Sequence, residues 1–236
     1  MRRLVVTIDG PAASGKSTVA RRVAERIDAT FLDTGAMYRA VTWAAQQDGV
    51  DWHDESQLVR AIEGHSFVFA PGAEALNATV DGIDVTGAIR SPELTAHVRY
   101  VACAPAMRAR LVEMQRQFAD RYRRVVTEGR DQGTVAFPDA ELKFFLEADA
   151  AERARRRQAE LNAQGVAADL VELTQAIEAR DASDRNRAVG PLKPAADAIC
   201  VDTTKLSIDA VVECLLQHIK ESQSGNSKMK NPGRGE

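Results

Sequence analysis

The feature that most constrains this chain is a glycine-rich octapeptide, GPAASGKS, at residues 10–17. It matches the pattern G-x-x-x-x-G-K-[ST], in which backbone N–H groups surround phosphate oxygens, the lysine adds a positive charge and the hydroxyl can ligate Mg²⁺. A chain of 236 residues matches this pattern by chance roughly once in a hundred cases. Because the mechanism needs a strand before the loop and a helix after it, the motif predicts both a nucleoside triphosphate site and its local fold.

The flanking residues meet that requirement. Residues 4–8 form a β-branched apolar run typical of a buried strand, and the spacing of Val19, Val23 and Ile27 predicts a helix over 15–27. Other strands are expected at 30–33, 125–127, 143–146 and 198–201, and other helices at 105–121, 149–163, 167–187 and 207–220. This alternation predicts an α/β fold, a P-loop doubly wound five-stranded parallel sheet with helices on both faces.

A second pattern interrupts the alternation. Apolar and polar residues alternate over 76–80 and again over 83–86, and Asp81-Gly82 lies between them, which is the strongest short hairpin signal. Phe67-Val68-Phe69 supplies a third strand. We therefore expect a small antiparallel β insert at 65–90, within an α/β core formed by 1–64 and 91–221.

Composition excludes several classes of protein. A net charge of -3 argues against a general nucleic-acid coat, which would be basic. Cys103, Cys200 and Cys214 lack the spacing of a zinc ribbon or a secreted disulfide framework. The apolar run at 4–8 is too short for a signal peptide, and no run approaches the ~18 apolar residues of a membrane span. We expect a cytoplasmic monomer that binds neither nucleic acid nor membrane, with a polar, disordered tail at 222–236.

The phosphate-binding motif alone does not predict how the protein uses a bound triphosphate, so other motifs must be considered. No N-K-x-D tetrapeptide, with which GTPases recognise guanine, occurs in the chain. The strand at 125–127 is followed by Glu128, a carboxylate that a motor ATPase would also need, so this feature leaves a motor open.

Arginines at strand ends and helix starts indicate a second anion site. The run LDTGAMYR at 32–39 leads from a strand into a helix, with Thr34 as the expected N-cap and Arg39 one turn inside. Arg130 and Asp131 follow the third strand of the sheet, at the carboxyl edge where open α/β sheets bind ligands. Arg108 lies in the helix that begins near Pro105.

The octapeptide RDASDRNR at 180–187 is the most informative charged run. On a helix, Arg180, Asp184 and Arg187 share one face, and Asp181 and Arg185 form an i, i+4 pair. One interpretation is a solvent-facing helix with ion pairs. The other has two arginines that hold phosphate and a carboxylate between them that accepts from the amino group of cytosine but repels the carbonyl of uracil.

A second arginine run, ERARRR at 152–157, has two interpretations as well. Arg153, Arg156 and Arg157 on one helix face can form a lid over ATP that neutralises the transferred phosphoryl group and excludes water. A solvated helix with a Glu152–Arg156 pair is the alternative.

Taken in order, these motifs resemble those of bacterial cytidylate (CMP) kinases, within the P-loop nucleoside monophosphate kinases. The resemblance spans about residues 4–219. It is carried by TIDGPAASGKST at 7–18, FLDTGAMYRA at 31–40, EGRDQGTVAFPDA at 128–140, ERARRR at 152–157 and RDASDRNRAVGPL at 180–192. The hairpin insert adds to it, because an antiparallel insert in the monophosphate-binding region distinguishes this family from adenylate kinases.

The resemblance implies a role for each matched residue. The ATP phosphates would be held by Gly10, Pro11, Ala12, Ala13, Ser14, Gly15, Lys16, Ser17 and Thr18. The CMP site would be lined by Thr34, Arg39, Arg108, Arg130, Asp131, Arg180, Asp184 and Arg187. The catalytic set would be Lys16, Arg130, Arg153, Arg157 and Arg180, with an arginine-rich lid near 152–165. Ser17 would ligate Mg²⁺, with Glu128 acting through water.

Two positions depart from the family pattern. Arg99 stands where many relatives carry a small hydroxyl residue that contacts the base, and Glu128 stands where some relatives carry Asp. The first puts one base contact in question, and the second puts the water-mediated role at Mg²⁺ in question.

The implied reaction is transfer of the terminal phosphoryl group of ATP to CMP or dCMP, giving ADP and (d)CDP, in pyrimidine nucleotide metabolism. The attacking phosphate is already ionised, so no general base is needed, and positioning and charge neutralisation would supply catalysis. The alternatives are a kinase that prefers UMP or AMP, a non-catalytic nucleotide-binding regulator, and a P-loop protein that binds nucleic acid, which the acidic pI disfavours.

Overall fold

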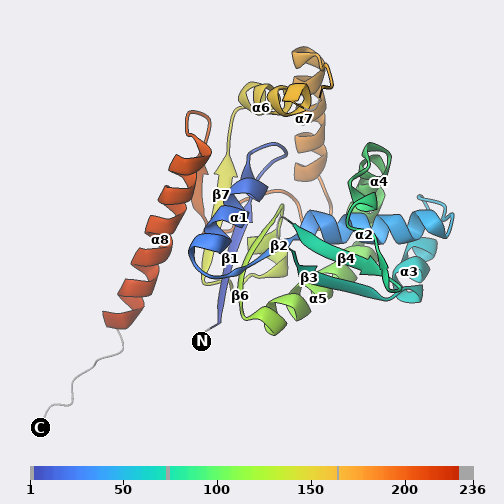
Figure 1. The fold of residues 1–236 in the computed structure, drawn as a ribbon, viewed down its shortest axis with the longest axis horizontal. Helices are drawn as coiled ribbons and strands as arrows, with labels where there is room; N and C mark the ends of the chain where they lie inside the picture. Colours follow the sequence, from blue (N-terminus) through green and yellow to red (C-terminus); the bar gives the residue numbers. More distant parts are fainter. Residues whose placement is uncertain (1–2, 73–74, 164, 229–236) are drawn as a thin grey trace, which may run out of the picture.

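The structure, a computed structural model, describes residues 3–72, 75–163 and 165–228. Its main sheet has five parallel strands in the order β2-β6-β1-β7-β8 (Figure 1). The strands are β1 (Leu4–Asp9), β2 (Thr30–Asp33), β6 (Arg124–Gly129), β7 (Leu142–Glu147) and β8 (Ile199–Asp202). The predicted fold class is confirmed, and the first strand of the chain occupies the centre of the sheet, where the phosphate-loop motif emerges from it.

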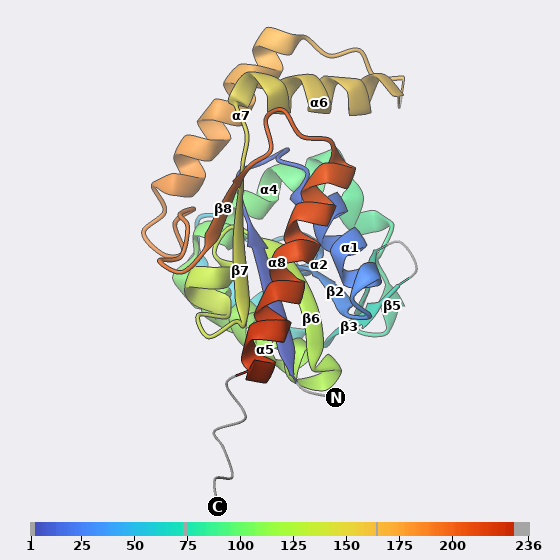
Figure 2. The ribbon, with the colours of Figure 1, turned by 90° about the vertical axis from the view of Figure 1, so that its left-hand side faces the viewer.

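Helices cover both faces of this sheet, because side chains alternate along each buried strand. Leu4, Val6 and Ile8 of β1 pack with α1 (Lys16–Arg26) and α8 (Ile208–Lys228), which lie in front of the strands in Figure 2. Val5 faces the opposite side and belongs to a larger cluster that includes α2 (Thr34–Gln47) and α5 (Pro105–Tyr122).

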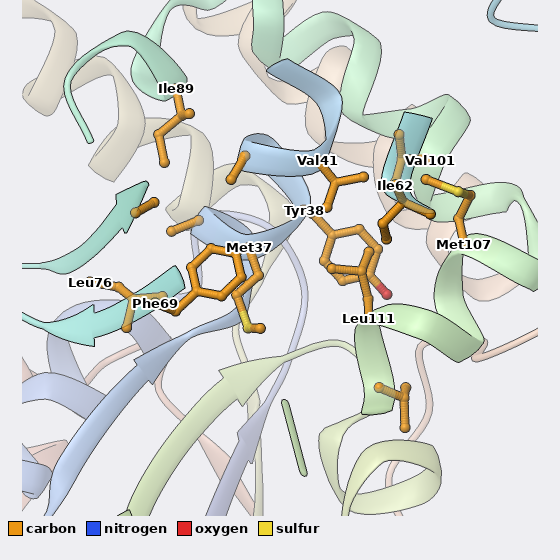
Figure 3. Packing of buried hydrophobic residues seen from close by; sticks show 14 of the residues in the cluster. Met37, Tyr38, Val41, Ile62, Phe69, Leu76, Ile89, Val101, Met107 and Leu111 are labelled. Carbon is orange, nitrogen blue, oxygen red and sulfur yellow. The ribbon is translucent and has the colours of Figure 1, made fainter. Parts of the chain in front are cut away.

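The larger cluster is centred on α2. Figure 3 shows Met37, Tyr38 and Val41 of this helix packed among residues from the insert and three other helices. The surrounding residues include Ile62 of α3 (Glu55–Gly64), Val101 of α4 (Pro92–Cys103), and Met107 and Leu111 of α5. Met37 is fully buried, and burial of such a side chain contributes about 1.5–3 kcal/mol. Packing therefore fixes the helix that carries two of the candidate site residues.

The predicted insert is present as a three-stranded antiparallel sheet, β3 (Phe67–Pro71), β4 (Leu76–Val80) and β5 (Ile83–Asp84). Asp81 and Gly82 both have positive φ, 51° and 80°, as a two-residue hairpin turn requires. In β4, Leu76, Ala78 and Val80 are buried. The insert therefore packs its apolar face on the core side, against α2.

The arginine-rich segments form α6 (Ala150–Ala163) and α7 (Leu170–Arg185), which stand together beyond the carboxyl end of the sheet (Figure 1). A 3₁₀ turn, η1 (Ala88–Arg90), precedes α4, and a π-helical turn, η2 (Gln132–Ala136), follows β6. Among the described residues, no helix is long and apolar enough to cross a membrane.

One boundary expectation is wrong. The tail was expected to be disordered from Ser222 onward, but α8 extends to Lys228. An existing helix is extended more easily than a new one is started, so α8 continues through 222–228 although Gly225 and Asn226 are poor helix formers. The expectation for 229–236 lies outside the described residues.

Candidate functional site

The phosphate-loop motif connects β1 to α1 in the way its pattern predicts. Gly15 is the N-cap of α1, has a φ of 82° and offers no side-chain cap, so the first N–H groups of the helix are left for a ligand. A Cβ on Gly10 would lie 2.4 Å from the carbonyl oxygen of Leu146, so the loop passes β7 at a distance that only glycine allows. The backbone is thus shaped to bind an anion.

Lys16 lies over this loop and is buried. Its Nζ donates to the carbonyl oxygen of Pro11 at 3.0 Å and lies 3.9 Å from Oε2 of Glu128. Burial, followed by the nearby Arg130 guanidinium, lowers the pKa of Lys16 to about 7, against the opposing effect of Glu128. The surroundings therefore disfavour the lysine's charge, and an anionic ligand beside it would restore that charge.

Glu128, at the end of β6, joins the loop to α2. Ser17 Oγ donates to Glu128 Oε1 at 3.0 Å, and Thr34 Oγ1 donates to the backbone carbonyl of Glu128 at 2.7 Å. The expectation that Thr34 caps α2 is wrong, because the N-cap is Asp33, whose Oδ1 accepts from the backbone N–H of Ala36 at 2.9 Å.

Asp33 also changes the expected anion site at this helix start. Its carboxylate already occupies the N-terminus of α2 and pairs with Arg39 at 3.3 Å. The helix start is therefore neutralised by the protein itself, and Arg39, although paired with Asp33, is the basic side chain that this segment contributes to a neighbouring pocket.

A pocket, here called the arginine-rich pocket, opens beside Glu128. It is lined by Lys16, Ser17, Thr34, Gly35, Tyr38, Arg39, Thr95, Val98, Ala102, Arg108, Glu128, Gly129, Arg130, Asp131, Arg180, Asp184 and Arg187. Every residue expected in the CMP site lies in this set. Chain segments that are far apart in sequence meet here, so the 180–187 run does not simply face bulk solvent.

Asp184 lies between two arginines in this pocket and is 2% exposed. Its Oδ2 accepts from Arg130 Nε at 2.7 Å, and its Oδ1 accepts from Arg187. Arg187 was expected on the same helical face, but α7 ends at Arg185. The chain turns back after the helix, where the backbone N–H of Leu192 donates to the carbonyl of Asp184, and this turn directs Arg187 to the carboxylate.

A second charged group forms the floor of the pocket. The buried Arg108 pairs with Asp131, and its Nη1 donates to the hydroxyl of Tyr38 at 3.0 Å. Burial raises the pKa of Tyr38 to about 12, although Arg108 acts against this, and burial also raises the pKa of Asp131 against the same guanidinium. Tyr38 is therefore a neutral phenol, and its hydroxyl oxygen holds Arg108.

A second cavity, here called the phosphate-loop pocket, adjoins the first. It is lined by Ala12, Ala13, Gly15, Lys16, Ser17, Thr18, Arg39, Arg157, Glu160, Leu173, Ala176, Ile177 and Arg180. The two pockets share Lys16, Ser17, Arg39 and Arg180. Within the described residues, Arg180 forms no hydrogen bond or ion pair, so its guanidinium is available at the boundary between the cavities.

The three arginines expected on one face of α6, which are Arg153, Arg156 and Arg157, have separate surroundings. Arg153 is 3% exposed and lines neither pocket. It donates to the carbonyls of Ala148 at 2.8 Å and Ala12 at 3.0 Å, and it pairs with Asp181 at 2.6 Å. The expected Asp181–Arg185 pair is therefore wrong, because a long-range ion pair takes the carboxylate.

Arg156 and Arg157 have partners that differ from those of Arg153. The expected Glu152–Arg156 pair is present at 3.3 Å, and Arg156 Nη2 also donates to the carbonyl of Thr203 at 2.6 Å. Arg157 is about half exposed, pairs with Glu160 at 3.0 Å and borders the phosphate-loop pocket. Of these three side chains, only Arg157 is placed to reach a ligand there.

Several pocket residues were missed by sequence reasoning. Arg99 is exposed and donates to the hydroxyl of Tyr100 at 2.9 Å, whereas Thr95, Val98 and Ala102 of α4 line the arginine-rich pocket. The helical spacing of the last three residues was available as a signal, and so was the spacing of Leu173, Ile177 and Arg180 in α7. Tyr38 was visible beside Arg39 but carried no charge to mark it.

Comparison with known proteins decides the family. Residues 6–221 match the family described as cytidylate kinase. The chain belongs to this family. The cytidylate kinase of Rhodopirellula baltica is 45% identical over 218 residues, which cover 92% of this chain and 93% of that protein. That relative spans nearly the same length as this cytidylate kinase family member.

A longer relative has a second activity in its name. The bifunctional pantoate ligase/cytidylate kinase of Synechococcus elongatus is 47% identical over 231 residues, which cover 96% of this chain and 44% of that protein. This family member therefore spans less than half the length of that relative. A solved structure of an uncharacterized protein from Eubacterium ventriosum superposes with a TM-score of 0.51 at 12% identity, covering 92% of this chain and 99% of that one. That likeness concerns the fold alone.

Proposed function

We propose that this protein transfers the terminal phosphoryl group of ATP to CMP or dCMP, giving ADP and (d)CDP. The observation that carries the proposal is the buried carboxylate of Asp184, held by Arg130 and Arg187 in a pocket that shares Lys16 and Arg180 with the phosphate-loop pocket. Two adjoining anion sites with common basic residues allow direct transfer between two bound nucleotides.

The donor nucleotide is assigned to the phosphate-loop pocket. The backbone N–H groups of residues 10–18 would surround its phosphates, and Lys16 would contact the transferred group. Lys16 and Arg180 lie where the two pockets meet. Their charges would offset the negative charge that spreads over the phosphoryl oxygens during transfer.

The acceptor is assigned to the arginine-rich pocket. Arg39 and Arg130 would hold its phosphate, and Asp184 would accept from the amino group of cytosine. Uracil presents a carbonyl at the same position and would meet the carboxylate oxygen with repulsion. Arg108, Asp131 and Tyr38 form a fixed floor beside the sugar and base, since each is buried and partnered.

The residues present fit a magnesium ion. Ser17 Oγ and Glu128 Oε1 are adjacent oxygen atoms, 3.0 Å apart; Ser17 lines both pockets and Glu128 lines the arginine-rich one. Mg²⁺ prefers oxygen ligands together with substrate phosphates and water. Ser17 would ligate the ion and Glu128 would hold one of its waters. When bound, Mg²⁺ supplies charge neutralisation to the phosphate chain.

The α6–α7 segment is assigned as the lid, and the insert at 65–90 as part of the monophosphate-binding region. Arg157 would reach the donor phosphates from the lid, and Arg180 would reach both nucleotides. We assign Arg153 a positioning role at the base of the lid, since it contacts the phosphate loop and α7 and lines neither pocket. Exclusion of water by the closed lid would protect the phosphoryl group from hydrolysis.

The remaining assignments rest on composition. A net charge of -3 and a site built for small anions suit a cytoplasmic enzyme that acts on free nucleotides rather than on nucleic acid. We propose a monomer, and sedimentation velocity at micromolar concentration measures this directly.

The deciding experiment is a screen of common nucleoside monophosphates with ATP and Mg²⁺, with the diphosphate products followed by chromatography. We expect CMP and dCMP to give the highest kcat/KM. A higher value for UMP or AMP would favour the neighbouring kinase class. Binding of ATP and CMP without ADP release would favour a non-catalytic regulator.

A further inference from the structure

Asp9, the last residue of β1, has a role that the assigned chemistry does not use. Its side chain is 4% exposed, and no described cation forms an ion pair with it. Instead, Oδ1 accepts from the backbone N–H of Gln132 and Oδ2 accepts from that of Gly133, both at 2.8 Å. One carboxylate therefore binds two successive amides at the start of the π-helical turn η2.

This arrangement connects the two nucleotide sites through the sheet. Asp9 immediately precedes Gly10, the first residue of the phosphate loop, and pairs in register with Gly129 of β6. Gln132 and Gly133 immediately follow Arg130 and Asp131, which line the arginine-rich pocket. The chain between these two anchors is short, so the amides held by Asp9 determine where the Arg130–Asp131 segment lies.

Neighbouring polar groups hold the side chain of Gln132 separately. Thr127 Oγ1 donates to Gln132 Oε1 at 2.9 Å, and Gln132 Nε2 donates to Gln115 Oε1 at 3.3 Å. Thr127 and Gln115 are both fully buried. These bonds support the turn but do not involve the backbone N–H groups that Asp9 binds, so the two sets of contacts can be tested apart.

The energetics argue that Asp9 is kept for more than packing. Burial raises the pKa of Asp9 to about 7, with a smaller effect in the same direction from Asp131, and the two backbone N–H groups and Lys16 act against the shift. Isolated carboxylates are expensive to bury, whereas two aligned N–H donors form charge-assisted bonds to an ionised one. A π-helical turn is rare and occurs frequently at functional sites.

We propose that Asp9 is a positioning residue that fixes Arg130 and Asp131 relative to the phosphate loop, and thereby sets the distance between the acceptor and the donor phosphate. This inference deepens the proposed function and rests on it. It predicts that loss of the carboxylate weakens use of the monophosphate while the phosphate loop still binds ATP.

The test is Asp9→Asn, assayed with wild type against varied monophosphate and against varied ATP. Asn retains one acceptor and turns an NH₂ group toward the second backbone N–H, so one amide loses its partner. We expect KM for CMP to rise by about tenfold or more and kcat to fall, with KM for ATP changed by less than about twofold.

Thr127→Val is the matched control. It removes a buried hydrogen bond to the same turn but leaves the amides of Gln132 and Gly133 bound to Asp9. We expect Thr127→Val to lower Tm about as much as Asp9→Asn does, and to leave KM for CMP unchanged. If both variants raise KM for CMP alike, or if Asp9→Asn raises KM for ATP as much as for CMP, the turn is a structural element only and the inference fails.

Two further measurements decide the test if CMP is not a substrate or if Asp9→Asn does not fold. If wild type does not use CMP, the proposed function fails, and the same comparison is made by calorimetry with whichever monophosphate binds most tightly. If Asp9→Asn does not fold, hydrogen exchange in wild type decides: the amides of Gln132 and Gly133 must exchange as slowly as those of β1. Exchange at the rate of an exposed loop would overturn the inference.

Discussion

The phosphate loop and the arginine-rich pocket bind anions with different chemical groups. The phosphate loop presents backbone N–H groups, and its shape depends on Gly10 and Gly15 within a segment of eight residues. The arginine-rich pocket presents side chains from α2, α4, α5, α7 and the segment after β6. The loop is local in sequence, although α2, α6 and α7 complete the pocket around it, whereas the arginine-rich pocket has no comparable local part.

The difference has an energetic side as well. A backbone loop offers N–H dipoles without net charge, so its one charge is that of Lys16, whose pKa is lowered by burial first and by the Arg130 guanidinium second. The arginine-rich pocket concentrates guanidinium groups and holds them by carboxylates, with Asp33, Asp131 and Asp184 each paired to one or two arginines. A ligand phosphate there competes with carboxylates already in place, which makes recognition depend on exact side-chain identity.

Replacement of the one charged group in the phosphate loop is the strongest test of this contrast. Lys16→Ala removes the cation at the boundary of both pockets, so we expect kcat to fall by about 10²–10³-fold or more. Backbone N–H groups should still bind ATP. Steady-state kinetics together with ATP titration checks this, and near-normal phosphorylation of CMP would refute the assigned role.

Loss of the base-reading carboxylate should have the next largest effect. In Asp184→Ala the cytosine amino group loses its acceptor, and we expect the CMP/UMP ratio of kcat/KM to fall by about 10–100-fold. Asp181→Ala is the control, since it also removes a buried carboxylate of α7 but one that pairs with Arg153 outside the pocket. An unchanged ratio in Asp184→Ala would remove that residue from base recognition.

A smaller effect is expected at the floor of the arginine-rich pocket. Tyr38→Phe deletes the hydroxyl that accepts from Arg108 and leaves the ring packed in the core. Since Asp131 still holds the guanidinium, we expect KM for CMP to rise by about 3–10-fold with little change in kcat. Tyr100→Phe, on the surface side of α4, is the matched control, and equal effects of the two would contradict the assignment.

The smallest change concerns the loop backbone. Ala13 adopts a left-handed conformation with φ of 57°, which costs about 1–2 kcal/mol for a residue with a Cβ. Ala13→Gly removes that strain but adds unfolded-state entropy, so we expect a net stabilisation of about 0.5–1 kcal/mol with unchanged nucleotide selectivity. Urea unfolding measures it, and a destabilised variant would show that the loop does not store strain there.

The same contrast explains what the sequence could predict. Strand runs, the hairpin at Asp81-Gly82 and the loop at 10–17 depend on neighbouring residues, and the sequence predicts each of them. The order of strands in the sheet was not predicted, because pairing of β1 with β6 and β7 is set by packing over long separations.

The partners of charged side chains are what the sequence predicts least well. Helical spacing paired Asp181 with Arg185, but folding brings Arg153 to Asp181 from another helix. In the same way Asp33 displaced Thr34 as the cap of α2, since Asp is a strong N-cap residue and its carboxylate also pairs with Arg39. Spacing identifies which residues share a face, and it does not identify the partner that the face meets.

The four residues common to both pockets have a consequence for inhibitor design. Because Lys16, Ser17, Arg39 and Arg180 line both cavities, a single compound that joins two nucleosides through one continuous polyphosphate bridge would follow these four residues from one cavity to the other. Its second half then binds at the high effective concentration set by the bridge. The number of bridging phosphates that gives the tightest binding would measure the separation at which transfer takes place.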